Sequence, residues 1–271
     1  MMAGRIALIE VFKTTQRIQQ ENRELKARTL HMQAGTLLYL GGFEAVEPKV
    51  KCEAAEIEVV EDTTFHCAQG YADGRSRVAV LNFANAYSPG GGVQSGAMAQ
   101  EECLCRSSNL YSALTLPYLL KNYYKWNGKN TGDMGTDAVI YSPGVTVFRS
   151  DDAIPEDLVE WFETDVLTCA APYLNPDRKK PVSMEKLEEV FLRRISNILE
   201  VAAANDADVL VLGAFGCGAF RNPPELVAEV FHHLLVKNGY GRFFRKVVFA
   251  IKKNDERNTN LEAFRKILLE Q

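Results

Sequence analysis

Short runs of apolar residues that end in turns recur along most of this chain. Such runs are typical of strands that are buried on both faces of a sheet. They are RVAVLNFAN (77–85), DAVIYSPGVTVFR (137–149), DVLTCAAPYL (165–174), ADVLVLGAFG (207–216) and KVVFAIKK (246–253). A further segment, AAEIEVVEDTTFHC (54–67), alternates β-branched and polar residues and also predicts a strand.

Segments with a helical period lie between these runs. Apolar residues about one turn apart predict helices over residues 5–40, 101–116, 183–205, 225–236 and 260–270. Strands that alternate with such helices favour an α/β fold, here a three-layer α/β/α sandwich with a mixed or largely parallel sheet. We expect residues 1–75 to form an N-terminal helical extension packed on the core, and residues 76–271 to form the main domain. Residues 122–135 are expected to form a long loop or insertion.

Composition and charge remove several classes of function. The formal net charge is −4, which does not support a nucleic-acid-binding protein. The six cysteines include no CxxC pair and have no His-x3-His partner motif, so we expect free thiols, no metal and no cofactor. We find no signal peptide and no apolar stretch of membrane-spanning length, and therefore expect a soluble, monomeric, cytoplasmic protein that does not bind membranes.

Two of the predicted strands end in glycine-rich loops, at the edge of the sheet where α/β proteins bind ligands. The later loop, GAFGCGAFRNPPELV (213–227), leads into a helix. Its glycines would expose main-chain N–H groups beside a helix N-terminus, which suits a phosphate or diphosphate. A tight structural turn is an equal alternative. Phe220 follows the glycines, and could lie against a ligand ring or in the core.

The earlier loop contains Gly90, Gly91 and Gly92 after Pro89. Consecutive glycines adopt conformations that other residues avoid and let a ligand approach the main chain closely. Asn85, at the end of the preceding strand, could hydrogen-bond a sugar hydroxyl or could cap the turn locally.

Adjacent carboxylates, Glu101 and Glu102, stand at the start of the next predicted helix. Acidic residues are favoured in a first helical turn for electrostatic reasons alone. In a confined site, however, two carboxyls raise the pKa of one of them, and a protonated Glu can protonate a leaving oxygen. This is the acid/base chemistry of glycoside cleavage. Neighbours on a helix point about 100° apart, so we expect only one of them to face the reacting bond.

The segment GGGVQSGAMAQEE resembles the GGG-x(6–8)-QEE signature of poly(ADP-ribose) glycohydrolases. NFAN and GAFGCGAFRNPP are also similar to the bacterial-type members of that family. The resemblance implies a macrodomain that binds ADP-ribose between the two loops, with Glu102 as the catalytic acid/base. It implies that Glu101 and Asn85 hold the terminal ribose, and that Gly90, Gly91, Gly92 and Val93 line this ribose and the phosphates. The further substrate-binding residues that it implies are Gln100, Gly216, Cys217, Gly218, Ala219, Phe220 and Asn222.

The expected ligand is therefore ADP-ribose or poly(ADP-ribose), free or attached to proteins, with release of units from chain ends. Phe220 would lie against a ribose. For the adenine we expect the end of the last strand, at residues 249–252. Two alternatives remain: a hydrolase that removes a single ADP-ribose from a protein side chain such as arginine, and a non-catalytic ADP-ribose-binding macrodomain.

Overall fold

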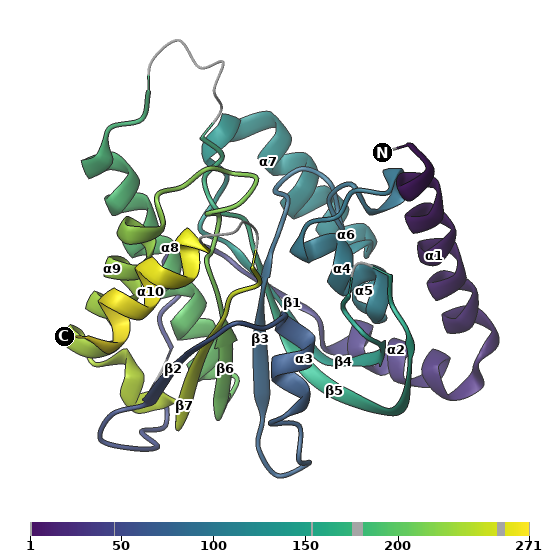
Figure 1. The fold of residues 1–271 in the computed structure, drawn as a ribbon, viewed down its shortest axis with the longest axis horizontal. Coiled ribbons are helices and arrows are strands. Elements are labelled where there is room, and N and C mark those ends of the chain that lie inside the picture. Colours follow the sequence, from purple (N-terminus) through teal and green to yellow (C-terminus); the bar gives the residue numbers. More distant parts are fainter. Residues whose placement is uncertain (1, 46, 153, 175–180, 254–257, 271) are drawn as a thin grey trace.

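The computed structural model describes residues 2–45, 47–152, 154–174, 181–253 and 258–270. Within them, seven strands form one sheet in the order β1-β4-β5-β3-β6-β7-β2 (Figure 1). The strands are β1 (Leu37–Tyr39), β2 (Glu56–Val60), β3 (Val78–Phe83), β4 (Val139–Arg149), β5 (Asp157–Cys169), β6 (Val209–Leu212) and β7 (Lys246–Ala250). From β5 to β2 all neighbours are parallel, whereas β4 is antiparallel to β5 and to β1. The predicted α/β fold with a mixed sheet is confirmed.

Helices cover both faces of this sheet. The α-helices are α1 (Met2–Glu21), α2 (Arg23–Gly35), α3 (Thr64–Gln69), α4 (Gln100–Ser107), α5 (Leu110–Leu114), α6 (Pro117–Leu119), α7 (Lys125–Asn130), α8 (Met184–Ala204), α9 (Pro224–His232) and α10 (Thr259–Leu269). Short 3-10 segments are η1 (Val93–Ser95), η3 (Gly132–Met134) and η5 (Tyr240–Phe243), and π-helical segments are η2 (Leu120–Tyr124) and η4 (His233–Lys237). Figure 1 shows α8, α9 and α10 beside β6 and β7, and α1 to α6 around the other half of the sheet.

The central strand β3 is buried on both faces, as its apolar run predicts. Side chains alternate along a strand, so Ala79 and Leu81 join the core under α8, α9 and α10, while Val78 and Val80 join the core under α3, α4 and α5. The result is a three-layer sandwich with a separate apolar core on each side of the sheet.

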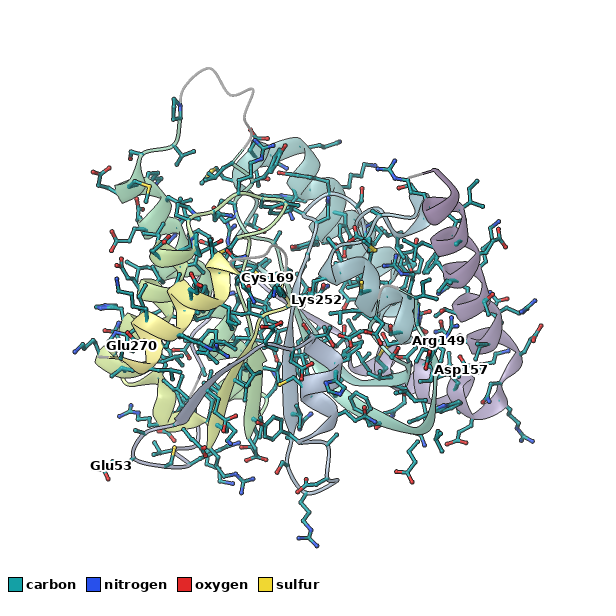
Figure 2. The ribbon with its side chains drawn as sticks, viewed as in Figure 1. Glu53, Arg149, Asp157, Cys169, Lys252 and Glu270 are labelled. Carbon is teal, nitrogen blue, oxygen red and sulfur yellow. The ribbon has the colours of Figure 1, made fainter. Side chains whose placement is uncertain are left out.

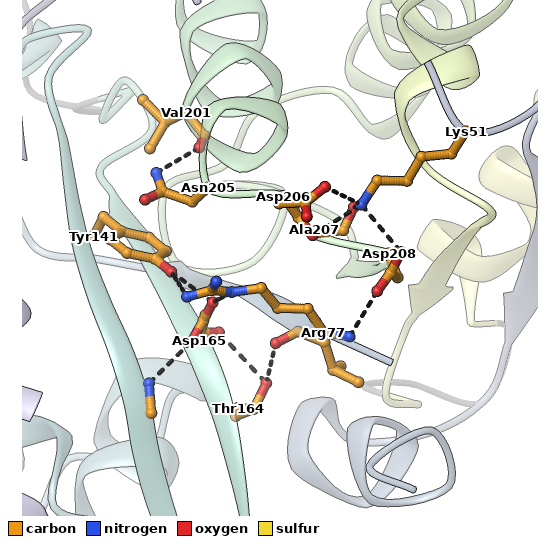
Figure 3. Close-up of polar contacts among 12 residues, drawn as sticks. Lys51, Arg77, Tyr141, Thr164, Asp165, Val201, Asn205, Asp206, Ala207 and Asp208 are labelled. Carbon is orange, nitrogen blue, oxygen red and sulfur yellow. Dashed lines mark hydrogen bonds and ion pairs between the residues drawn. The ribbon is translucent and has the colours of Figure 1, made fainter. Parts of the chain in front are cut away.

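A polar network ties the strands together at the amino end of β3. Arg77 donates from Nε to Asp165 Oδ2 at 2.6 Å and from a terminal nitrogen to the Tyr141 hydroxyl at 2.8 Å (Figure 3). The Tyr141 hydroxyl itself donates to Asp165 Oδ2 at 2.6 Å. Lys51 pairs with Asp208, directly before β6, at 3.0 Å. These contacts lie at the edge opposite the carboxyl ends of β3, β6 and β7, which therefore remain available for a ligand.

The N-terminal third differs from the expectation in its boundaries. The helix predicted over residues 5–40 is divided at Asn22, whose side chain caps α2 by accepting from Leu25 N at 2.9 Å. The boundary predicted between residues 75 and 76 separates β1 and β2 from the strands they pair with, because both are edge strands of the same sheet. The helical segment that precedes the sheet ends at Gly35.

The expected long loop at residues 122–135 is instead mostly helical. It holds the end of η2, then α7 and η3. Tyr123 and Tyr124 are buried in the core rather than exposed in a loop, which explains why this polar, aromatic stretch is ordered.

Candidate active site

A cavity of about 680 Å³ opens where the parallel strands end. Phe83 at the end of β3, Ala250 at the end of β7, and Lys252 all line it. Figure 2 shows Cys169, the last residue of β5, and Lys252, two residues after β7, near the centre of the molecule. We call residues 84–99 loop 1 and residues 213–223 loop 2. Met98 and Ala99 of loop 1 line this cavity, and several residues of loop 2 line it as well.

Glu102 is fixed by its place at the start of α4. It is the third residue of the helix, and its Oε2 accepts from the N-cap N–H of Ala99 at 2.9 Å. Its Oε1 accepts from Gly92 N–H at 2.8 Å. Glu102 is 7% exposed and is not itself among the residues that line the cavity, although its hydrogen-bond partner Ala99 is. Glu102 therefore has a structural role at the start of α4, and the same two hydrogen bonds hold its carboxylate against loop 1.

Glu101 is more deeply buried, at 2% exposure. Its Oε2 accepts from Asn85 N–H at 2.7 Å, which ties α4 to the end of β3. Burial, with a smaller contribution from the Glu102 charge, raises the pKa of Glu101 to about 8, and the hydrogen bond from the Asn85 N–H opposes this shift. A carboxyl of this kind keeps its proton at neutral pH.

Both carboxyls converge on Gly91. This residue has φ +57, and a Cβ atom there would collide with Glu102 Oε1 and would lie 3.1 Å from Glu101 Oε2. Position 91 therefore requires a glycine for two reasons: its backbone is left-handed, and two acidic side chains approach it closely. The structure brings together the glycine triplet and the acidic pair that the sequence placed in one candidate site.

Gln100 ties the start of α4 to the end of β3 and to Thr64 of α3. Its Oε1 accepts from Phe83 N–H at 2.8 Å, and its Nε2 donates to Leu81 O at 2.7 Å and to Thr64 Oγ1 at 3.0 Å. Its amide therefore fixes α4 on the end of β3, although the residue also lines the cavity.

Asn85 and Val93 have structural roles in loop 1. The Asn85 side-chain oxygen accepts from the N–H groups of Tyr87 at 2.8 Å and Ser88 at 3.0 Å, so it caps the turn locally. The Val93 side chain is fully buried in the core, which leaves only its main chain to face a ligand.

Loop 2 encloses the other side of the cavity. Gly216, Gly218, Ala219 and Phe220 line it. Gly216 has φ +77, and a Cβ atom there would collide with Ala171, whereas at Gly218 there is open space. The Phe220 ring packs edge-on against Tyr173 at 5.5 Å between centroids.

Two other predicted residues of loop 2 lie away from the cavity wall. Asn222 Nδ2 donates to Pro172 O at 2.8 Å and to Gly216 O at 2.9 Å, so this buried side chain shapes the loop. Cys217 is largely buried, and burial raises the pKa of its thiol.

Several residues that line the cavity are not among the site residues predicted from the sequence. Asp62, Thr63 and Thr64 follow β2, which had been assigned to the extension, and Asn260 lies in the first turn of α10. Asp151 joins them: its Oδ1 accepts from Thr63 Oγ1 at 2.6 Å, and its Oδ2 from Phe65 N at 2.8 Å. Of the segment proposed for adenine, Phe249 is buried in the core, while residues 250–252 line the cavity. The sequence signal was present, since Asp62 and Thr63 directly follow a strand.

The remaining chemistry is limited among the described residues. No three His, Cys, Asp or Glu side chains there form a group that could hold a metal ion. The cysteines are free thiols. Every helix in the described ranges is too short or too polar to cross a bilayer.

Comparison with known proteins identifies the family. Residues 7–150 match the family model of the microbial-type PARG catalytic domain, where PARG denotes poly(ADP-ribose) glycohydrolase. The structure of poly(ADP-ribose) glycohydrolase from Thermomonospora curvata is 32% identical over 96% of this chain and 98% of that chain, with a TM-score of 0.81. The same enzyme bound to the inhibitor ADP-HPD is 33% identical, covers 96% and 98%, and has a TM-score of 0.80.

A second bacterial enzyme is similar over most of its length. Poly(ADP-ribose) glycohydrolase from Deinococcus radiodurans in complex with ADP-ribose is 33% identical over 89% of this chain and 97% of that chain, with a TM-score of 0.77. No curated protein matches the chain. The family model spans more than half of the sequence, and it includes both the glycine triplet and the acidic pair. The chain belongs to the microbial-type poly(ADP-ribose) glycohydrolase family.

Proposed function

We propose that this protein hydrolyses the ribose–ribose O-glycosidic bond of poly(ADP-ribose) and releases ADP-ribose. One observation carries the proposal: two buried carboxyls, Glu101 and Glu102, converge on Gly91, and the residues on either side of this pair, Gln100 and Cys103, line the cavity. A volume of about 680 Å³ is within the range of small-molecule sites. The relatives with this fold include structures bound to ADP-ribose and to ADP-HPD, which supports the same ligand class here.

In the proposed reaction Glu102 is the acid/base. Its carboxyl gives a proton to the bridging oxygen as the bond from the anomeric carbon to that oxygen breaks, leaving an oxocarbenium-like sugar. A water molecule then adds to the anomeric carbon and returns a proton to Glu102. The products are ADP-ribose and a shortened polymer with a free ribose hydroxyl, so the proton count balances.

Glu101 supports this step by keeping a proton on the pair at neutral pH. Because the pKa of Glu101 is raised to about 8, the site does not have to hold two negative charges at pH 7. A protonated Glu101 can also donate a hydrogen bond to a ribose hydroxyl. We assign Asn85 and the main chain of residues 90–93 to the same ribose.

Loop 2 is the proposed diphosphate site. Gly216, Gly218 and Ala219 line the cavity with main chain rather than bulky side chains, and α9 begins directly after the loop. Phe220 would cover the adjacent ribose. We propose that the adenine lies toward residues 250–252, and that units are released from chain ends. A cytoplasmic location stays a prediction from the sequence.

The deciding experiment measures release of ADP-ribose from poly(ADP-ribose) by the wild type and by Glu102→Gln. We expect Glu102→Gln to lose at least 100-fold in kcat while its Kd for ADP-ribose stays within about tenfold, because an amide keeps the shape but cannot carry the proton. Hydrolysis of arginine-linked mono-ADP-ribose alone would assign the protein to the other hydrolase class. Binding without any turnover by the wild type would make it a non-catalytic reader.

A further inference from the structure

The N-terminal helix α1 lies directly against the loop that carries the glycine triplet. It packs on α4 and on η1, the short helix inside loop 1. Figure 1 shows α1 at one side of the molecule, next to α4 and α5 and separate from the sheet. Because α1 contributes no strand to the sheet but packs on loop 1, we ask how it affects the conformation of that loop.

The closest approach is between Gly96 and the first turn of α1. Gly96 has φ +73, and a Cβ atom there would collide with the carbonyl oxygen of Arg5 and lie 3.0 Å from Arg5 Cα. The main chain of loop 1 therefore lies against the main chain of α1 with no side chain between them. Such contact leaves loop 1 no room to move toward α1.

Tyr111 of α5 forms a second connection. One side of its ring meets Phe12 of α1 edge-on, at 5.0 Å between centroids and 84° between planes. The ring also packs under Gly90, where a Cβ atom would lie 2.8 Å from Tyr111 Cδ2. The Tyr111 hydroxyl accepts a hydrogen bond from Gln94 Nε2. One tyrosine thus contacts α1, the first glycine of the triplet and the 3-10 turn beyond it.

A third connection runs through a buried arginine. Thr15 of α1 donates to Arg106 O at 2.5 Å, and Arg106 is fully buried. Arg106 in turn donates from NH1 to Ala97 O at 2.7 Å, which holds the segment that leads into α4. Arg149, next to α1 in Figure 2, donates to Thr15 Oγ1 at 3.2 Å and closes this polar cluster.

We propose that the packing of α1 holds loop 1 in the conformation required for catalysis. Tyr111 is the positioning residue, because it contacts α1 on one side and Gly90 and Gln94 on the other. The inference rests on the proposed function of Glu102, whose Oε1 accepts from Gly92 between these two contact points. Displacing loop 1 moves this donor and alters how Glu102 meets the bond. Tyr111 itself does not touch the reacting atoms.

The chain offers a matched pair of variants. Tyr111→Phe removes the hydroxyl that accepts from Gln94. Tyr118→Phe removes a hydroxyl that donates to Thr36 O at 2.6 Å, away from loop 1. For each variant we would measure kcat on poly(ADP-ribose), Kd for ADP-ribose, the melting temperature and amide hydrogen exchange over residues 90–99.

We expect Tyr111→Phe to speed exchange in residues 90–99 and to lower kcat about tenfold, with Kd changed by less than about threefold, since small misplacements of reacting groups slow chemistry more than binding. Tyr118→Phe should leave kcat and loop exchange unchanged. Gln94→Ala should have the same effect as Tyr111→Phe, and the double variant should be no worse than either. Phe12→Leu should loosen the same segment from the α1 side.

Wild-type exchange over residues 90–99 in both Tyr111→Phe and Phe12→Leu would overturn the proposal. So would equal losses of kcat in Tyr111→Phe and Tyr118→Phe, because that would show a general effect of stability. The exchange measurement does not require turnover. A wild type that cleaves no polymer would therefore refute the proposed function while the role of α1 is still decided.

Discussion

The main chain of Gly91 lies against the Glu102 carboxylate with no room for a side chain between them. The N–H of the next residue, Gly92, donates to the same carboxylate. The glycine triplet therefore packs directly against the acidic pair, in addition to any contact that it makes with a ligand.

Gly91→Ala should nearly abolish activity. The new methyl group would displace Glu102 and would also strain a backbone with φ +57, so we expect kcat/KM to fall at least 100-fold. Gly74→Ala is the control, since Gly74 has φ +73 but no atom within 4 Å of a Cβ, and it should cost about 1 kcal/mol of stability without loss of activity. Equal activity of the two variants would refute this account of Gly91.

Glu101→Gln should make stability less dependent on pH. The folded-state pKa of Glu101 is about 8, against an ordinary 4.5, so between these values the folded protein keeps a proton that the unfolded chain has released. The free energy of unfolding of the wild type therefore falls as pH rises through this window. The variant lacks this loss, so its stability relative to that of the wild type should increase by about 4 kcal/mol between pH 4.5 and pH 8.

Thermal unfolding of wild type and Glu101→Gln at a series of pH values checks this. The difference in stability should be nearly constant below pH 4.5 and should grow toward pH 8. A difference that does not change with pH would mean that Glu101 is not the group with the raised pKa.

Substitutions at two glycines of loop 2 should distinguish an effect on stability from an effect on ligand binding. Gly216→Ala would collide with Ala171, so we expect a loss of about 2 kcal/mol in stability together with weaker ADP-ribose binding. Gly218→Ala has open space, so its melting temperature should stay unchanged while its Kd for ADP-ribose rises about tenfold if the loop binds the diphosphate. Calorimetric titration with ADP-ribose and melting curves measure these two effects. Normal binding of ADP-ribose by Gly218→Ala would place the diphosphate elsewhere.

Gln100→Glu should weaken the junction of α4 and β3. A carboxylate cannot donate to Leu81 O, and it would place an oxygen 2.7 Å from that carbonyl. We expect a loss of about 2 kcal/mol in stability and a lower kcat, with Gln20→Glu on the exposed face of α1 as the neutral control. Denaturant unfolding of both variants measures this directly, and a fully stable Gln100→Glu would show that the amide bonds contribute nothing.

Part of the fold was predictable because three central parallel strands, β3, β6 and β7, are short apolar runs between turns. β3, β6 and β7 were found in this way, and the two loops that follow β3 and β6 do lie on the cavity. The helix predicted over residues 183–205 is α8, and Ser183 caps it by accepting from Lys186 N at 3.2 Å. These features depend on local sequence, so a single chain suffices to recognise them.

Features that depend on distant pairing were not predictable. The edge strand β2 lies beside β7 only in the folded sheet, which is how Asp62 and Thr63 reach the cavity. Asn222 looked like a ligand contact, yet its partner is Pro172 O, fifty residues away in sequence. The raised pKa was expected for one member of the acidic pair, and only the burial of Glu101 shows which member it is.

Glu102 caps the first turn of α4, and it is also the residue that we propose as the acid/base. A carboxylate accepts the Ala99 N–H more strongly than a neutral carboxyl does, so the first turn of the helix is held more tightly in one half of the catalytic cycle than in the other. Each turnover would therefore weaken and then restore the hydrogen bond that caps the beginning of α4.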